Sequence, residues 1–323
     1  FYRRAAGLAD VDNPMSVIVQ RMVPSRSSGV LFTRRPDEPK GPALLVTAGQ
    51  GLGPEVSAGG ASADQFAGSR AKPHRILERR IAAKRARVVG AEGGGVARLA
   101  VQRPEVLEAA LTDEQVAQLA AVALEIERYF GGPQDIEWGF DADGRLFVLQ
   151  ARPLRTARPE SYGAVAPGAP VLLRGGDPVW HGRAVGPVHL ARTPREQEAT
   201  PAGAVLVVPE LLPDCVPLLP RLGGVVAERG TVTGHSASLL REFRIPSLFG
   251  VAGALDALAP GRVVSLDVAS RSLFDGALWP ELRGRLPGAL HGHSTGGVPA
   301  PPGRPPPKPS GSALRGTLGR PAL

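Results

Sequence analysis

The clearest hydrophobic pattern in the chain predicts a helix over residues 113–130. Apolar residues recur there at alternating intervals of three and four, which places them on one helix face: Val116, Leu119, Ala123, Ile126 and Phe130. Thr112 and Gln115 have the spacing of a capping box, and the pair Gly131-Gly132 ends the pattern.

Shorter runs of β-branched and aliphatic residues predict strands in the first part of the chain. Two of them, Val17–Val23 and Gly29–Thr33, flank a loop of proline and serine. A third strand, over residues 43–53, runs into a glycine-rich turn, and residues 51–66 predict a flexible loop. Residues 71–89 are basic but contain no aromatic side chains on which bases could stack, so we interpret them as a solvated face.

Residues 135–152 predict a β-hairpin, DIEWGF and RLFVLQAR joined by the turn DADG. With a four-residue loop, Phe140 faces Arg145, and Glu137 faces Val148. We then expect Glu137, Gln150 and Arg152 to project from one side, with Asp135 across from Gln150, and both faces of the hairpin to be packed.

Polar side chains on a packed hairpin are costly to bury without partners. One interpretation is structural, a salt bridge between Glu137 and Arg152. The other is a metal–phosphate site, because the oxygen atoms of Glu137 and Gln150 suit Mg²⁺ and Arg152 can bind a phosphate oxygen.

The second half of the chain predicts alternating strands and helices. A linker rich in proline, glycine and arginine covers residues 153–200 and contains a short strand pair over 171–190. Beyond it we expect strands over residues 203–211, 223–230 and 262–268, a short helix over 215–222 and a helix over 235–243.

His235 falls where a predicted strand ends and a predicted helix begins. Its neighbours in GTVTGHSAS are small, which leaves the imidazole approachable. The free amides and partial positive charge of a helix N-terminus can hold a phosphoryl group carried on the ring. A Ser/His/Asp hydrolase is disfavoured because residues 203–268, around His235, contain no G-x-S-x-G motif, and His181 and His189 receive no role.

The composition is that of a globular protein with an aliphatic core, at 43% hydrophobic and 5% aromatic residues. The net charge of +8 is mostly a property of the tail, since six basic residues and no acidic ones follow Leu282. We therefore expect no nucleic-acid partner. No stretch approaches the roughly 20 apolar residues of a membrane span, and the single Cys215 suits a reducing compartment, so we expect a cytoplasmic protein without a membrane partner.

Two groups of motifs resemble the phosphoenolpyruvate synthase and pyruvate phosphate dikinase family. VIVQRMV, SGVLFT, GLG, LTDEQV, PQDIEW and LFVLQARPL resemble the carboxyl-terminal half of its ATP-grasp domain. Residues 203–251, with GTVTGHSASLLREFRIPSLFGV, resemble its mobile phosphohistidine domain. The resemblance implies an α/β (α+β) protein: a partial ATP-grasp domain over 1–155, a linker and the start of the second domain over 156–200, and a swivelling β/β/α domain over 201–275. Residues 276–323 are a basic tail rich in proline and glycine, which we expect to be disordered because it has too little apolar content to offset its ordering entropy.

The resemblance also implies roles for individual residues. His235 would carry the phosphoryl group, Glu137 and Gln150 would bind Mg²⁺, and Arg152 would contact ATP. Thr233 matches a position at which such enzymes are regulated by phosphorylation. The sequence departs from the family pattern at Gly230-Thr231 (usually Gly-Gly), Ser238 (usually aliphatic) and Pro54 (usually acidic). The first two suggest a divergent subfamily, and the third puts the nucleotide role of the glycine loop in doubt.

The resemblance implies a phosphotransferase with paired acceptors, similar to pyruvate, water dikinase, which relays a phosphoryl group from ATP through His235 to pyruvate or another small acceptor. An enzyme resembling rifampicin phosphotransferase is an alternative. In that arrangement a long antibiotic-binding domain separates the two domains, whereas only 83 positions separate Arg152 from His235, which favours the first function. A non-catalytic phosphocarrier or degenerate remnant is another alternative. The resemblance does not extend to the amino-terminal half of the ATP-grasp domain, so we expect this chain alone to be inactive with ATP, or to need a separate chain that supplies that half.

Overall fold

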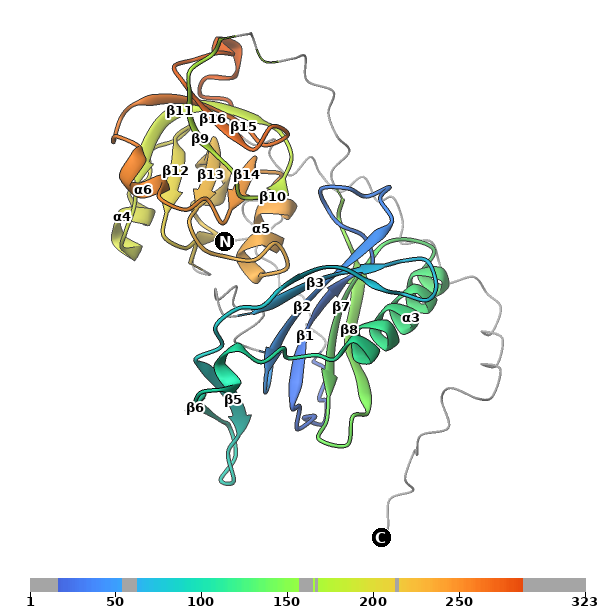
Figure 1. Ribbon diagram of the computed structural model, residues 1–323. Helices are drawn as coiled ribbons and strands as arrows, with labels where there is room; N and C mark the ends of the chain where they lie inside the picture. The colour runs from blue at the N-terminus through green and yellow to red at the C-terminus, as the bar shows by residue number, and fades with distance from the viewer. Residues whose placement is uncertain (1–16, 54–62, 157–164, 166–167, 213–214, 287–323) are drawn as a thin grey trace.

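A computed structural model describes residues 17–53, 63–156, 165, 168–212 and 215–286. The described chain forms a six-stranded sheet, an eight-stranded sheet and a separate two-stranded hairpin. The first sheet is built from the amino-terminal part of the chain and the second from the carboxyl-terminal part, and helix α5 (His235–Phe243) lies on the side of the second sheet that faces the first (Figure 1).

The six strands of the first sheet pair in an antiparallel manner, in the order β4-β3-β2-β1-β7-β8. Their bounds are Ile76–Arg80 (β4), Asp64–Ser69 (β3), Ala43–Gln50 (β2), Ser27–Phe32 (β1), Gln134–Phe140 (β7) and Leu146–Pro153 (β8). The two-stranded hairpin is β5 (Ala86–Gly90) and β6 (Val96–Ala100), followed by the short helix η1 (Glu105–Leu107).

The long helix α3 (Asp113–Phe130) covers one face of the first sheet (Figure 1). Its bounds, the Thr112–Gln115 capping box and the left-handed Gly131 cap confirm the prediction. The apolar stripe packs against alternate strand residues in one buried cluster that includes Leu31, Leu44, Val46, Phe66, Ile136 and Trp138. Phe130, at the end of the stripe, is exposed.

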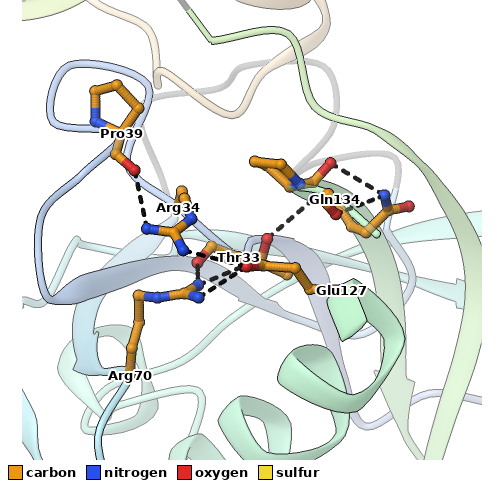
Figure 2. Close-up of polar contacts among 8 residues, drawn as sticks. Thr33, Arg34, Pro39, Arg70, Glu127 and Gln134 are labelled. Atoms are coloured by element: carbon orange, nitrogen blue, oxygen red, sulfur yellow. Dashed lines mark hydrogen bonds and ion pairs between the residues drawn. The ribbon is translucent and has the colours of Figure 1, made fainter. Parts of the chain in front are cut away.

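Ionic and hydrogen-bonding contacts tie the end of α3 to the sheet (Figure 2). Arg70 donates to both carboxylate oxygens of Glu127, at 2.9 and 2.8 Å, and also to the carbonyl oxygen of Thr33. Arg34 lies 3.5 Å from the same carboxylate. The Thr33 hydroxyl accepts the amide of Gln134 at 2.9 Å, which joins the end of β1 to the start of β7.

The eight-stranded sheet has the order β10-β14-β13-β12-β11-β15-β16-β9. Strands β11 to β14 pair in parallel and the outer strands pair antiparallel. The bounds are Val171–Arg174 (β9), Asp177–Trp180 (β10), Arg183–Leu190 (β11), Val205–Val208 (β12), Gly224–Ala227 (β13), Ser247–Phe249 (β14), Val263–Asp267 (β15) and Ser272–Asp275 (β16). Four short helices complete this part: α4 (Pro194–Glu198), η3 (Leu219–Arg221), α6 (Ala254–Ala257) and η4 (Pro280–Leu282).

Several predictions of local structure are wrong. The run Val17–Val23 forms no strand. Both edges of β1 are already paired, with β2 and β7, and residues 17–19 are strongly exposed. Residues 64–66, expected in a loop, belong to β3, whereas residues 54–62 of that loop lie outside the described residues. The strands within 171–190 do not pair with each other, since β9 and β10 lie at opposite edges of the second sheet.

The predicted helix over 215–222 is not an α-helix. It contains 3₁₀ conformation at Cys215 and the 3₁₀ turn η3, because prolines at 217 and 220 remove backbone donors. The last strand, β16, was not predicted. The segment 276–286, assigned to the tail, is ordered: the Trp279 ring lies 4.0 Å from the Arg183 guanidinium. The predicted disorder of the tail concerns residues 287–323, outside the described residues.

The second face of the first sheet packs against the second half of the chain. Val30, Phe32 and Leu45 from that face share one buried cluster with residues of α5 and the loop before it, among them Val232, Ala237 and Leu240. This shared core fixes which surface of the first sheet meets His235 and its loop. None of the helices in the described part of the chain is long and apolar enough to span a membrane.

Candidate functional site

Two rows of side chains cross the sheet face opposite α3. Direct register partners project from the same face of a sheet, as do residues two apart in a strand. The first row is Leu45, Phe32, Asp135 and Arg152, one residue each from β2, β1, β7 and β8. The second row is Thr47, Val30, Glu137 and Gln150, from the same strands. All three predicted hairpin site residues therefore lie on this face.

The predicted register of the hairpin is wrong, although the shared face is confirmed. Phe140 pairs with Leu146 rather than Arg145, because the Asp141 carboxylate accepts the Arg145 amide at 2.8 Å and holds that residue inside the turn. An irregularity between Glu137 and Trp138 shifts the pairing further. As a result Glu137 lies opposite Gln150, where Val148 was expected.

Arg152 pairs with Asp135, so the predicted Glu137–Arg152 salt bridge is wrong. Its Nε and Nη2 atoms each lie 2.9 Å from Oδ2 of Asp135. Burial raises the pKa of the Asp135 carboxyl, and the charges of Arg152 and Arg241 and the hydrogen bond from Arg152 offset only part of that rise. Asp135 is buried and Arg152 is half exposed, so the pair lies at the boundary between the sheet face and solvent.

Glu137 and Gln150 lie opposite each other on β7 and β8 and bring a carboxylate and an amide together. Neither side chain makes a hydrogen bond or ion pair with another described residue. Glu137 is partly buried and Gln150 is exposed. One carboxylate and one amide oxygen on adjacent strands fit Mg²⁺, which takes one or two carboxylates from the protein and further oxygens from phosphates and water. No group of three His, Cys, Asp or Glu residues with metal-site geometry occurs among the described residues.

His235 is the first residue of α5, as the sequence predicts. Gly234 is its N-cap, and the imidazole side chain is exposed while the residues around it are buried. The loop before the helix is fixed by Arg241, whose Nη1 donates to the carbonyl oxygen of Val232, and by the Ser236 hydroxyl, which donates to Leu211 at 2.7 Å. This arrangement presents the ring beside the free amides of a helix N-terminus.

Three contacts place the His235 loop and α5 on the two rows. The Thr233 hydroxyl bonds to the hydroxyl of Thr47 at 2.6 Å, in the second row. The Arg241 guanidinium lies 4.9 Å from the centre of the Phe32 ring, in the first row. Arg152 Nη2 lies 3.4 Å from the Ser238 hydroxyl. Thr233 and Ser238, which lie on either side of His235 in the sequence, therefore both contact this face of the sheet.

Sequence reasoning missed Thr47 and Arg241 and treated Asp135 only as a neighbour. A signal for Arg241 was present, because it follows Ala237 by four positions and so lies on the buried face of the helix. Ser238, where the family usually has an aliphatic residue, contacts Arg152. Of the other departures from the family pattern, Gly230 has a φ of +131° and Pro54 lies outside the described residues.

Comparison with known proteins gives the family. The description "Pyruvate phosphate dikinase, AMP/ATP-binding domain" matches residues 1–166. The chain belongs to the pyruvate phosphate dikinase AMP/ATP-binding domain family. A second description, "PEP-utilising enzyme, mobile domain", matches residues 200–271. The mixed α/β structure agrees with the first match, and the two rows of residues come entirely from the segment that it covers.

Curated relatives of the family support the same assignment. The phosphoenolpyruvate synthase of Pyrococcus furiosus is 32% identical over 279 residues, covering 83% of this chain and 34% of the relative. That of Neisseria meningitidis serogroup B is 33% identical over 276 residues, covering 79% and 34%. The chain thus spans about a third of the length of these relatives. Among solved structures, holo aconitase X of Thermococcus kodakaraensis gives a TM-score of 0.26 at 17% identity over 32% of this chain and 97% of its own, which carries no argument about fold or function.

Proposed function

We propose that this chain carries the nucleotide face and the phosphohistidine of a phosphoenolpyruvate synthase-type phosphotransferase. Residues 1–155 would be the carboxyl-terminal part of an ATP-grasp domain, and 156–200 the linker and start of the second domain. Residues 201–275 would be the swivelling β/β/α domain and 276–323 the tail. The observation that carries the proposal is the bracketing of the exposed His235 by Thr233 and Ser238, both of which contact the face that bears Glu137, Gln150 and Arg152.

In the first step, a ring nitrogen of His235 attacks a phosphorus atom of ATP. A nitrogen–phosphorus bond forms, and the bond from phosphorus to the leaving oxygen breaks. The α5 amides and the positive end of the helix stabilise the charge on the transferred group. Arg152 holds a phosphate oxygen, and Glu137 and Gln150 would hold Mg²⁺, which supplies charge neutralisation over the phosphate oxygens when bound.

In the second step, pyruvate loses a methyl proton to a base and becomes its enolate. The enolate oxygen attacks the same phosphorus atom, and the nitrogen–phosphorus bond breaks to restore His235. The exposure of His235 suits a group that must meet two different partners. The names of the curated relatives support pyruvate as the acceptor and favour this function over a rifampicin phosphotransferase. Thr233 remains a proposed regulatory position, and the cytoplasm a proposed location.

The carrier step can be tested on this chain with potassium phosphoramidate, a small chemical donor that needs no nucleotide site. We expect one acid-labile, base-stable phosphoryl group on His235, and none in His235→Ala. His189→Ala is the matched control, because His189 is engaged with the carbonyl oxygen of Glu196 at 2.9 Å and should leave labelling unchanged. Labelling that persists in His235→Ala would overturn the assignment.

The nucleotide face can be tested separately by equilibrium binding of AMP-PNP with and without Mg²⁺. Binding should require Mg²⁺ and should be lost in Arg152→Gln. Arg271→Gln is a suitable control, since Arg271 lies 3.6 Å from Asp37 and not on either row. Binding that is independent of both Mg²⁺ and Arg152 would exclude the proposed nucleotide site.

A further inference from the structure

Asp135 lies between two arginines that belong to different halves of the chain. In the first row it is opposite Phe32 on β1 and opposite Arg152 on β8. The guanidinium of Arg241, from α5, is stacked over the Phe32 ring at 4.9 Å. The Asp135 carboxylate is therefore flanked by Arg152 on one side and by Phe32 with its stacked Arg241 on the other.

Only one of these arginines has the carboxylate as a hydrogen-bond partner. Arg152 Nε donates to Oδ2 of Asp135 at 2.9 Å, and its Nη2 lies 2.9 Å from the same oxygen and 3.4 Å from the Ser238 hydroxyl. Arg241 is 3% exposed, and its Nη2 atom is buried without a hydrogen-bond partner. A buried guanidinium with an unpaired N–H is unfavourable, so Arg241 stands to gain from a second acceptor.

The electrostatics of the two groups agree with this geometry. Burial lowers the pKa of Arg241 to about 10, the charge of Asp135 opposes that change, and the charge of Arg152 adds to it. Arg152 thus acts against Arg241 in two ways, as a competitor for Asp135 and as a like charge. Because Arg152 is half exposed, water can replace its bonds to Asp135 at little cost.

We propose that Asp135 is a positioning residue that exchanges between Arg152 and Arg241 and thereby couples phosphate binding to the docking of the His235 loop. When a phosphate group of a nucleoside triphosphate binds Arg152, the Asp135 carboxylate is released from Arg152 and accepts a hydrogen bond from Arg241 instead. Arg241 also holds the carbonyl oxygen of Val232, three positions before His235, so the loop is drawn onto the sheet face with it. The phosphate part of this inference rests on the proposed nucleotide function, whereas the exchange between the arginines does not.

The exchange can be tested without nucleotide by hydrogen exchange of the full chain, read from peptides covering residues 229–243. Arg152→Gln should free Asp135 for Arg241 and slow exchange in these peptides at least about fivefold, the lower range of coupling between sites. Asp135→Asn should speed exchange. It should also abolish the effect of Arg152→Gln when the two are combined.

Two further variants keep the test decisive. Arg241→Lys retains the positive charge but loses the planar fork, so it should erase the Arg152→Gln effect even if Asp135→Asn fails to fold. Arg271→Gln, which removes the ion pair with Asp37, should change exchange equally with and without Arg152→Gln. The inference is overturned if Arg152→Gln leaves exchange unchanged or speeds it, or if its effect survives Arg241→Lys.

Addition of Mg²⁺ and AMP-PNP then separates the inference from the proposed function. If the nucleotide binds, it should slow exchange of residues 229–243 in the unaltered chain as Arg152→Gln does. Binding without such slowing overturns the coupling of phosphate to docking. If the nucleotide does not bind, that result counts against the proposed nucleotide function. The exchange of Asp135 between Arg152 and Arg241 is then tested by the variants Arg152→Gln, Asp135→Asn and Arg241→Lys alone.

Discussion

The hydroxyl of Thr233 donates a 2.6 Å hydrogen bond to the hydroxyl of Thr47, a residue 186 positions earlier in the chain. Both residues are buried, Thr47 completely. The bond joins the loop that precedes His235 to strand β2 of the first sheet. Thr233 is also the position that we predict to be regulated by phosphorylation. In this arrangement its hydroxyl is buried and hydrogen-bonded to Thr47.

We predict that Thr47→Val weakens the contact between the two halves of the chain. The variant keeps the side-chain shape but removes the acceptor. Among the described residues, the remaining contact of the Thr233 hydroxyl is the Thr231 hydroxyl, at 3.4 Å. Loss of a buried hydrogen bond costs about 1–3 kcal/mol when one partner stays unsatisfied. Urea denaturation measures the loss, and Thr233→Val combined with Thr47→Val should cost less than the sum of the two single changes. Strict additivity would contradict the prediction.

We predict a large stability loss for Lys84→Met, because Lys84 and Asp64 form a fully buried ion pair. Lys84 Nζ lies 2.6 Å from Asp64 Oδ1, and the side chains are 1% and 0% exposed. The same carboxylate accepts the amides of Ala82 and Ala110, at 2.9 and 2.8 Å. Removing one partner of a buried pair leaves an uncompensated charge and typically costs about 3–5 kcal/mol. Thermal denaturation would show the loss.

An exposed ion pair provides the control for that change. Arg79 pairs with Asp113 at the start of α3, and their side chains are largely accessible to water. We expect Arg79→Gln to change the free energy of unfolding by less than about 1 kcal/mol, as surface pairs usually do. Equal losses for the two variants would show that burial of the Lys84–Asp64 pair does not matter.

We predict that the chain loses stability in acid partly through Glu127, on α3. Burial alone would raise its pKa, but the hydrogen bonds from Arg70 and Thr33 and the charges of Arg70 and Arg34 lower the pKa below the ordinary 4.5. A carboxyl with a lowered folded-state pKa stabilises the fold above its unfolded pKa, and that stability disappears as the pH falls through the folded-state value. The free energy of unfolding should therefore decline from about pH 5 downward, and Glu127→Gln should flatten this decline. An unchanged slope in Glu127→Gln would contradict the prediction.

Local patterns predicted the elements whose signals lie within a few neighbouring residues. Helix α3 with its caps and the position of His235 at the start of α5 are of this kind. The face shared by Glu137, Gln150 and Arg152 also followed from strand alternation, even though the register did not, because a shift of two residues keeps side chains on the same face.

Contacts between distant segments were beyond such patterns. Nothing near Thr47 signals Thr233, and the pairing of Asp135 with Arg152 depends on where the turn and the irregularity in β7 and β8 fall. The strands β9 and β10 were recognised within their segment, but their places at opposite edges of the second sheet depend on partners far along the chain. Leu173 of β9 pairs with Leu273, and Asp177 of β10 pairs with Phe249. The run Val17–Val23 has the composition of a strand but no partner among the described residues.

We predict that Glu137→Ala removes Mg²⁺-dependent nucleotide binding without destabilising the fold. The Glu137 side chain makes no hydrogen bond or ion pair with a described residue, so its loss should change the free energy of unfolding by no more than about 0.5 kcal/mol. Asp135→Ala is the matched comparison on the same strand and face. It leaves the buried guanidinium of Arg241 without the opposite charge of Asp135 and should cost more than about 1 kcal/mol.

A second variant tests whether Glu137 and Gln150 bind Mg²⁺ together. Gln150 lies directly opposite Glu137, so Gln150→Glu places two carboxylates side by side and should tighten Mg²⁺ binding, measured by titration calorimetry. If the site is structural instead, Gln150→Glu only adds like-charge repulsion on adjacent strands and lowers stability that Mg²⁺ does not restore. In a longer relative, Glu137→Ala at the matching position should abolish phosphorylation of the histidine from ATP. Phosphorylation that continues at the same rate per folded molecule would show that Glu137 holds no metal.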